Sequence, residues 1–182
     1  MPNAVLETIA ARRSHRAYAE TPVTEEQLQA ILDACLQAPS AINRQPWHVS
    51  VVRDRKLLDE INSEVVKDMK AQAAGKKVPE DYHVFFHAPL VIFLSADPEW
   101  RYSQLDCGIA VENMNLAAES LGLGCVILGR PRAAFEGERR EEFERARDFW
   151  PKETFMIALA VGVATDDKPA HPIAKGHISY IG

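Results

Sequence analysis

Cysteine is scarce in this chain of 182 residues, and its three cysteines stand alone. Cys35, Cys107 and Cys125 lie far apart within apolar patterns, and no two of them form a CxxC pair. This spacing argues against a disulfide framework and against a cysteine-rich metal site. We expect three buried free thiols, because an isolated cysteine packs as a small hydrophobic side chain.

The chain also lacks a long hydrophobic run and an excess of positive charge. No apolar stretch approaches the ~20 residues that span a bilayer, and the N-terminus lacks the basic-then-apolar order of a signal peptide. A formal net charge of −5 argues against a nucleic-acid surface. With 47% hydrophobic residues, the sequence predicts a single cytoplasmic domain over residues 1–182, with neither membrane nor nucleic acid as a partner.

Periodicity and capping signals predict helices and strands in mixed order. A capping box at Thr24 opens a helix that ends before Pro39. The apolar run 90–95 is typical of a buried strand, and residues 102–121 are apolar on most sides, which predicts a buried helix. Further helices are expected over 3–12, 55–72, 81–87 and 138–149, and further strands over 47–53, 125–128, 155–163 and 177–181. This order is typical of a layered α+β sandwich.

Two polar stretches hold most of the side chains suited to a ligand. The first is Arg12-Arg13-Ser14-His15-Arg16, at the end of the first predicted helix. Guanidinium groups match phosphate oxygens in geometry, so this stretch suits a phosphorylated ligand. The alternative is a solvated basic helix end, because cations favour helix C-termini.

The second stretch covers residues 39–47 and forms a polar turn with an Asn, a Gln and a Trp. Here the alternative is an ordinary end of a helix and start of a strand. In that interpretation Trp47 lies in the core, as large aromatic side chains usually do.

At this spacing the two stretches resemble the signature of the nitroreductase family, flavin enzymes that hold FMN at a homodimer interface. The resemblance continues through residues 106–113, 116–124 and 125–129, and so spans most of the chain. It implies a nitroreductase-like three-layer sandwich of α+β class, with a central mixed or antiparallel sheet flanked by helices. It also implies that two chains interlock as a homodimer.

The resemblance assigns FMN contacts to the first stretch. Arg12 and Ser14 match residues that bind the FMN phosphate in the family. Arg16 matches a basic residue near the pyrimidine edge of the flavin ring, where a cation stabilises the negative charge that reduction places there. Arg13 has a weaker claim, because this position varies in the family.

Two more groups of flavin contacts follow from the resemblance. One is a loop that the second subunit contributes, with Gln45 opening the strand behind it. The other is a set of backbone groups at the end of a strand, where a glycine lets the backbone approach the ring closely. The loop corresponds to Pro39, Ser40, Ala41, Asn43 and Gln45, and the strand end corresponds to Ile127, Leu128 and Gly129.

The chain departs from the family pattern at two places. Many relatives complete the phosphate site with a Lys or Arg pair before a terminal strand, whereas this chain offers Lys168, Ala170, His171 and Lys175. His171 and Lys175 both stay candidates for that role. Larger members also place an Asn and a Lys near the pyrimidine edge, from a helix aligned with residues 80–87, and neither is present here.

Two other patterns carry little functional weight. His83 and His87 have the i, i+4 spacing of zinc ligands, but no HExxH motif and no third ligand accompany them, so we expect no metal. Gly122, Gly124 and Gly129 match neither a Walker motif nor a complete GxGxxG. Asp106, on the long helix, is expected to be structural.

The resemblance therefore predicts an FMN-dependent oxidoreductase with a ping-pong mechanism. NAD(P)H reduces the flavin and leaves, and a small electron-poor acceptor such as a nitroaromatic or a quinone takes its place. The cofactor carries the chemistry, so no side chain is expected to act as a nucleophile or general base. The alternative is a non-catalytic flavin-binding or sensor protein on the same scaffold.

Overall fold

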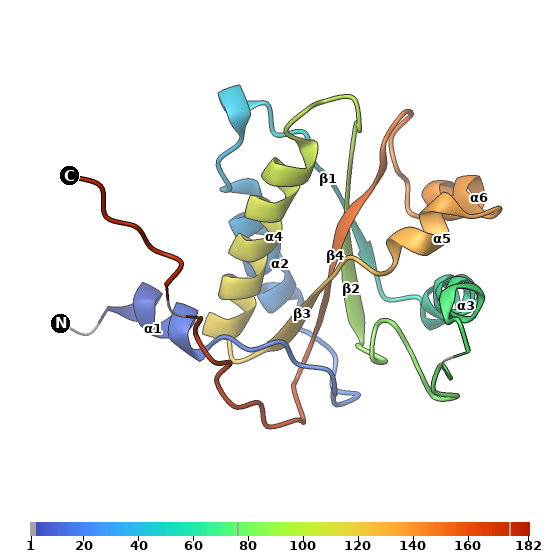
Figure 1. The fold of residues 1–182 in the computed structure, drawn as a ribbon, viewed down its shortest axis with the longest axis horizontal. Coiled ribbons are helices and arrows are strands. Elements are labelled where there is room, and N and C mark those ends of the chain that lie inside the picture. Colours follow the sequence, from blue (N-terminus) through green and yellow to red (C-terminus); the bar gives the residue numbers. More distant parts are fainter. Residues whose placement is uncertain (1–2, 76, 175) are drawn as a thin grey trace.

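The computed structural model describes residues 3–75, 77–174 and 176–182 (Figure 1). The described part holds helices on both faces of one sheet, which confirms the α+β prediction. In chain order the elements are α1 (Ala4–Ala11), α2 (Glu25–Leu36), the 3-10 turn η1 (Ala41–Asn43), β1 (His48–Val52), α3 (Arg55–Gln72), β2 (Leu90–Ala96), α4 (Ser103–Ser120), β3 (Gly124–Leu128), α5 (Arg132–Glu136), α6 (Arg140–Ala146) and β4 (Thr154–Gly162).

The four strands form one antiparallel sheet in the order β1-β2-β4-β3. Every residue of β2 is buried, because this strand has neighbours on both edges and helices on both faces. Ile92 and Leu94 of β2 belong to one apolar cluster, and Val91 and Phe93 to the other. The continuous apolar run in the sequence therefore reflects a strand that is covered on both sides.

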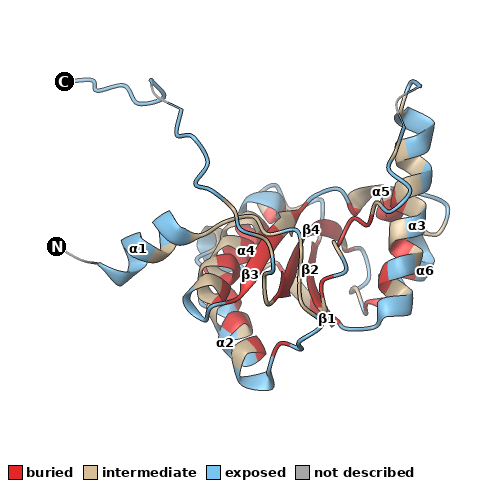
Figure 2. Cartoon of the chain, turned by 90° about the horizontal axis from the view of Figure 1, so that it is seen from below, coloured by how far each residue is buried: buried red, intermediate tan, exposed pale blue. Residues whose placement is uncertain are grey.

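Helices α2 and α4 cover one face of the sheet, and α3, α5 and α6 cover the other (Figure 1). The strands appear as the buried centre between helices with exposed outer surfaces (Figure 2). This arrangement confirms the three-layer sandwich. Among the described residues, no helix combines the length and the apolar character needed to cross a membrane.

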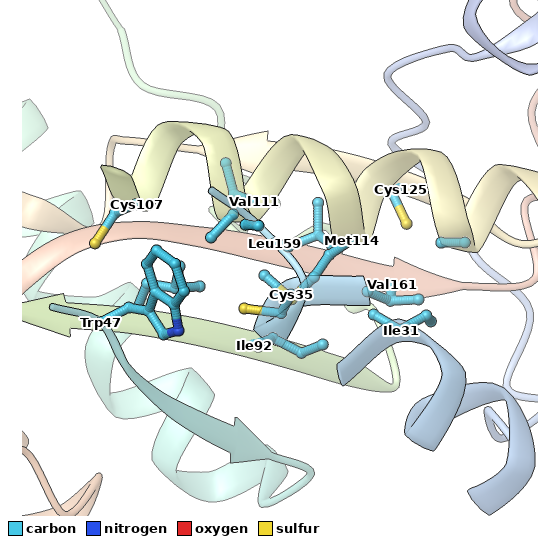
Figure 3. Packing of buried hydrophobic residues seen from close by; sticks show 14 of the residues in the cluster. Ile31, Cys35, Trp47, Ile92, Cys107, Val111, Met114, Cys125, Leu159 and Val161 are labelled. Atoms are coloured by element: carbon cyan, nitrogen blue, oxygen red, sulfur yellow. The ribbon is translucent and has the colours of Figure 1, made fainter. Parts of the chain in front are cut away.

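One apolar cluster lies between α4 and the sheet and contains Trp47. Trp47 packs there with Ile92 and Leu159 of the sheet (Figure 3) and is 6% exposed, so the core interpretation of this tryptophan is correct. Cys35 and Cys107 belong to the same cluster. As predicted, all three cysteines are buried free thiols.

The predicted helix over residues 81–87 is wrong, since this segment forms turns. The side chain of Asn62, on α3, accepts a hydrogen bond from the backbone of Val84 at 2.8 Å and donates one to the carbonyl of Tyr82 at 3.4 Å. These contacts take backbone groups that a helix would use itself. Phe86 and His87 then adopt φ values of 53° and 54°, outside the helical region.

Two further predictions need correction. The helix expected over 138–149 is present only as the shorter α6, and the chain before it forms a separate helix, α5, which ends where Gly137 is extended, with φ −89° and ψ −175°. The tail segment 177–181 forms no strand in the single chain and is exposed. A strand needs a partner edge, and the tail runs away from the sheet (Figure 1).

Helix α4 is buried on one face only. Met114 and Val111 pack against the sheet, whereas Leu105 is 61% exposed and Ile109 is half-buried on the opposite side. The prediction that this helix is covered on most sides therefore does not hold for a single chain. A shallow hollow lies on the uncovered face, between Leu105 and Asn113.

Candidate functional site

The segment Arg12–Arg16, called the arginine turn below, lies against the edge strand β3. Ser14 forms a parallel bridge with Cys125, and the backbone N–H of His15 donates to the Cys125 carbonyl at 2.9 Å. Tyr18 then bridges the chain just after β4, at Ala164. The turn is thus fixed between β3 and the segment that leaves β4.

Two glycines make room for this arrangement. Gly124 of β3 pairs with Gly162 of β4 in the sheet. A Cβ at Gly124 would lie 2.5 Å from the Cβ of Ala164 and 3.0 Å from the ring of His15. A Cβ at Gly162 would lie 2.9 Å from the ring of Tyr18. Both positions require glycine because the arginine turn and the residues after it lie so close to the sheet.

Asp166 joins the arginine turn to the chain beyond β4. Its carboxylate lies 2.7 Å from Nδ1 of His15, accepts a hydrogen bond from the backbone N–H of Arg16 at 2.9 Å, and pairs with Nζ of Lys168 at 3.2 Å. Desolvation alone would raise the pKa of Asp166. The contacts with Arg16, His15 and Lys168 outweigh it and lower that pKa to about 2, so the group is ionised at neutral pH.

Tyr18 also stabilises the arginine turn through a hydrogen bond. Its hydroxyl donates to the carbonyl of His15 at 2.8 Å. Burial is the largest of the effects that raise the pKa of this hydroxyl far above its usual value, so the group stays a neutral donor.

The arginines of the turn differ in how much of their hydrogen-bonding capacity is used. Nε of Arg12 lies 3.7 Å from the carboxylate of Glu112 on α4, which makes a loose ion pair. The Arg12 side chain is 23% exposed. Arg13 instead donates to the main-chain carbonyls of Ala10, Arg12 and Lys168 at 2.7, 2.9 and 3.3 Å. Arg12 therefore retains donors for a ligand, whereas Arg13 is engaged with the backbone.

Arg16 is exposed and lies over the ring of Phe86, with its guanidinium carbon 5.8 Å from the ring centroid. Phe86 belongs to the turn that replaces the predicted helix over 81–87. Residues from that segment are therefore close to Arg16, although the Asn and Lys of larger family members are missing.

The second polar stretch forms a tight loop with a strained backbone. Ile42, Asn43 and Gln45 have φ values of 53°, 56° and 49°. The backbone N–H of Gln45 donates to the hydroxyl of Ser40 at 2.8 Å, and its side chain donates to Oδ1 of Asn43 at 3.0 Å. Pro39, Asn43 and Gln45 are exposed, whereas Ser40 and Ala41 are half-buried.

Asp106 anchors this loop to the first turn of α4. Its carboxylate is 1% exposed and accepts hydrogen bonds from the backbone of Ala41 at 3.1 Å and from the indole of Trp100 at 3.3 Å. Its predicted structural role agrees with these contacts.

The structure does not bring the two polar stretches together within one chain. The loop lies beside the start of α4, and the arginine turn lies near its end (Figure 1). Arg12 pairs with Glu112, and from Asp106 to Glu112 the helix extends roughly 9 Å.

The third group of predicted contacts lies at the end of β3. Ile127 is half-buried, Leu128 is buried, and Gly129 is exposed, with no atom near the position that a Cβ would take. Gly129 and Arg130 border a cleft of about 560 Å³ between α3 and α5. The backbone at this strand end is therefore accessible to a ligand.

His171 is exposed, and Lys175 lies outside the described residues. Lys168 pairs with Asp166 instead. The rings of His83 and His87 lie 4.2 Å apart, and within the described residues no three potential metal ligands come together.

Comparison with known proteins places this arrangement in a family. The model described as "Nitroreductase family" matches residues 9–163. A crystal structure of a nitroreductase with bound FMN from Desulfitobacterium hafniense is 34% identical, has a TM-score of 0.89, and overlaps 100% of both chains. A second FMN-bound nitroreductase, from Bacteroides fragilis, is 29% identical with the same TM-score of 0.89.

Curated sequences agree. The FMN reductase [NAD(P)H] of Bacillus subtilis is 30% identical over 183 residues, which cover 93% of this chain and 70% of that protein. A relative from Archaeoglobus fulgidus is 38% identical over 129 residues, and the match spans 68% of this chain but only 66% of that relative. The family match covers most of the chain and includes the arginine turn, the loop and the end of β3. This protein therefore belongs to the nitroreductase family.

Proposed function

We propose that this chain is an FMN-dependent oxidoreductase that passes electrons from NAD(P)H to small electron-poor acceptors such as nitroaromatics or quinones. Family membership and the FMN in the two similar crystal structures support the cofactor. The Bacillus subtilis relative, an NAD(P)H-dependent FMN reductase by name, supports the electron donor. The observation that carries the proposal is the arginine turn, held against the glycines of β3 and β4, with Arg16 exposed and Arg12 retaining donors beside its loose ion pair with Glu112.

The residues present fit a flavin mononucleotide. Arg12 and the hydroxyl of Ser14 would hold the phosphate, since guanidinium and hydroxyl donors suit its oxygens. Arg16 would lie at the pyrimidine edge, and the open backbone at Ile127–Gly129 would face the ring. FMN, when bound, supplies the hydride chemistry. The protein then binds and orients it, while donor and acceptor occupy the same place in turn.

A homodimer would complete the site. In the single chain the loop is anchored at Asp106 and Arg12 pairs with Glu112, two different turns of α4. The uncovered face of α4 exposes Leu105, and α1 exposes Val5 and Leu6, each 64% exposed. Apolar surface of this kind is typical of an interface. A second chain would cover it and contribute the loop.

The tail provides a test of this assembly. Its terminal residues Tyr180 and Ile181 are 93% and 99% exposed in the single chain. We expect truncation after Lys168 to cost both dimerisation and flavin, because the tail would dock on a neighbouring chain and carries His171 and Lys175. A truncated protein that stays dimeric by light scattering and yellow by absorbance would contradict the interlocked arrangement.

Activity itself is tested by colour. The purified protein should be yellow, bleach under anaerobic NADH or NADPH, and recover its colour when a nitroaromatic is added. Failure to bleach with either donor would favour the non-catalytic flavin-binding alternative. A steady-state screen of both donors against nitro compounds, quinones and free flavin would then identify the preferred acceptor.

The cofactor assignment is tested by Arg12→Ala. Loss of a charge-assisted hydrogen bond to phosphate should raise the FMN dissociation constant roughly tenfold or more, measured by fluorescence titration. Arg53→Ala serves as the control, because Arg53 pairs only with the exposed Glu25 on the surface. Equal FMN affinity in the two variants would sink the phosphate assignment.

A further inference from the structure

Asp166 is an unexpected residue beside a phosphate site. The carboxylate is ionised, 17% exposed, and in contact with two residues of the arginine turn, His15 and Arg16. A negative charge at this place repels a phosphate and weakens its binding by Coulomb's law. Its presence therefore calls for a compensating role.

We propose that Asp166 is a positioning residue for the cofactor phosphate, fixing the arginine turn in the conformation that binds it. The proposal rests on the function proposed above. Asp166 does not contact the phosphate. It acts through His15 and Arg16, whose positions set the direction of the side chains of Arg12 and Ser14.

The contacts explain how one carboxylate can fix the whole turn. One carboxylate oxygen contacts Nδ1 of His15, and the other accepts a hydrogen bond from the backbone N–H of Arg16. Two successive residues of the turn are therefore held at once. Arg13 adds a second link to the same segment, through the carbonyl of Lys168. A turn held from both sides loses little conformational freedom when a ligand binds, which favours affinity.

The environment keeps the carboxylate in this role. Nζ of Lys168 lies 3.2 Å from one oxygen and offsets its charge, while Nδ1 of His15 lies 2.7 Å from the other. The same partners keep it ionised across the neutral range, so its hydrogen bonds to the turn persist. The field that a phosphate would meet is therefore weaker than that of a free carboxylate.

The two effects of Asp166 have opposite signs, which makes the proposal testable. If the carboxylate acts only through its charge, Asp166→Asn should tighten FMN binding. If it positions the turn, the same change should weaken FMN binding, because only one of the two atoms that face His15 and Arg16 can then accept a hydrogen bond. Riboflavin lacks the phosphate but keeps the ring that Arg16 would meet, so loss of the positioning contact should weaken riboflavin binding less than FMN binding.

The experiment measures dissociation constants of FMN and riboflavin for the full-length protein freed of flavin. We expect Asp166→Asn to raise the FMN constant roughly tenfold and the riboflavin constant by clearly less. The matched control is Asp167→Asn, which removes the same charge from an exposed neighbouring residue. This control should leave both constants at the parent values or slightly tighten FMN.

A second variant removes the other partner of the contact between His15 and Asp166. His15→Phe keeps a ring beside Gly124 but removes the partner of Asp166, and it leaves the carboxylate in place. We expect a similar selective loss of FMN, and in the double variant the two losses should not add, because both break one contact. His15→Phe also carries the test alone if thermal melting shows that Asp166→Asn is unfolded.

The outcomes separate the two proposals. A parent protein that binds neither flavin contradicts the proposed function itself. A parent that binds FMN, with unchanged or tighter FMN binding in Asp166→Asn, overturns the positioning role alone. Equal losses for FMN and riboflavin also overturn it, since they indicate a general loss of structure.

Discussion

Replacing Gly124 with alanine should push the arginine turn away from the sheet. The added Cβ would lie 2.5 Å from the Cβ of Ala164 and 3.0 Å from two ring atoms of His15. The methyl of Ala164 is attached directly to the backbone and cannot rotate away. His15 is held by Asp166, so it cannot move without breaking that contact. The backbone of β3, or that of Ala164 and the turn, must therefore shift.

The expected cost follows from the packing. Inserting a methyl group into a filled space typically costs about 1–3 kcal/mol. For a domain of this length that loss lowers Tm by roughly 2–12 °C. FMN affinity should fall with it, because the displaced His15 belongs to the turn that carries Arg12 and Ser14.

Thermal unfolding followed by circular dichroism, at equal protein concentration, measures the stability change. Gly137→Ala is the matched control: its Cβ would meet its nearest neighbour, a carbonyl oxygen, at an ordinary 3.5 Å. The control should melt like the parent. If Gly124→Ala has the same Tm as the control and binds FMN as the parent does, the close approach of the turn to the sheet does not require a glycine at position 124.

Three further outcomes are expected. Arg16→Ala should retain FMN better than Arg12→Ala but lower the midpoint potential of the flavin, because a cation near the pyrimidine edge stabilises the reduced anion; a redox titration with an unchanged potential would contradict that placement. Asp106→Ala leaves two partly buried donors without an acceptor and should cost about 1–3 kcal/mol in urea unfolding, with faster proteolysis of the loop 40–45. The pKa of Asp166 is lowered in the folded protein, so its stabilisation is complete above the ordinary carboxyl pKa of about 4 and is lost as the pH falls toward 2. The Tm difference between the parent and Asp166→Asn should accordingly shrink over that range, and a constant difference would refute the assigned pKa.

The parts of the fold that sequence predicts well are those whose causes are local. The capping box at Thr24 is formed by contacts within four residues, and both of its hydrogen bonds are present. The strand β2 is evident because its whole length is apolar. The segment 81–87 fails for the opposite reason, since its backbone groups are taken by Asn62 on α3, which no local pattern could indicate.

The same distinction holds for the candidate site. The arginine turn is a local motif and is found from five consecutive residues. Asp166 was missed because it meets His15 and Arg16 only across about 150 positions of sequence. Gly124 was noticed only as part of a glycine string, because its meaning depends on its pairing with Gly162 and on the ring of His15.

Each polar stretch is held by one acidic residue that makes no contact with the proposed ligand. Asp106 accepts the backbone N–H of Ala41, and Asp166 accepts that of Arg16. Asp106 is buried in the first turn of α4, where the helix dipole favours a negative charge, whereas the charge of Asp166 is balanced by Lys168. Because the two acids hold opposite ends of the proposed site, a change at Asp166 should alter the preference for FMN over riboflavin. A change at Asp106 should weaken both flavins alike, since the loop it anchors would contact the ring that they share.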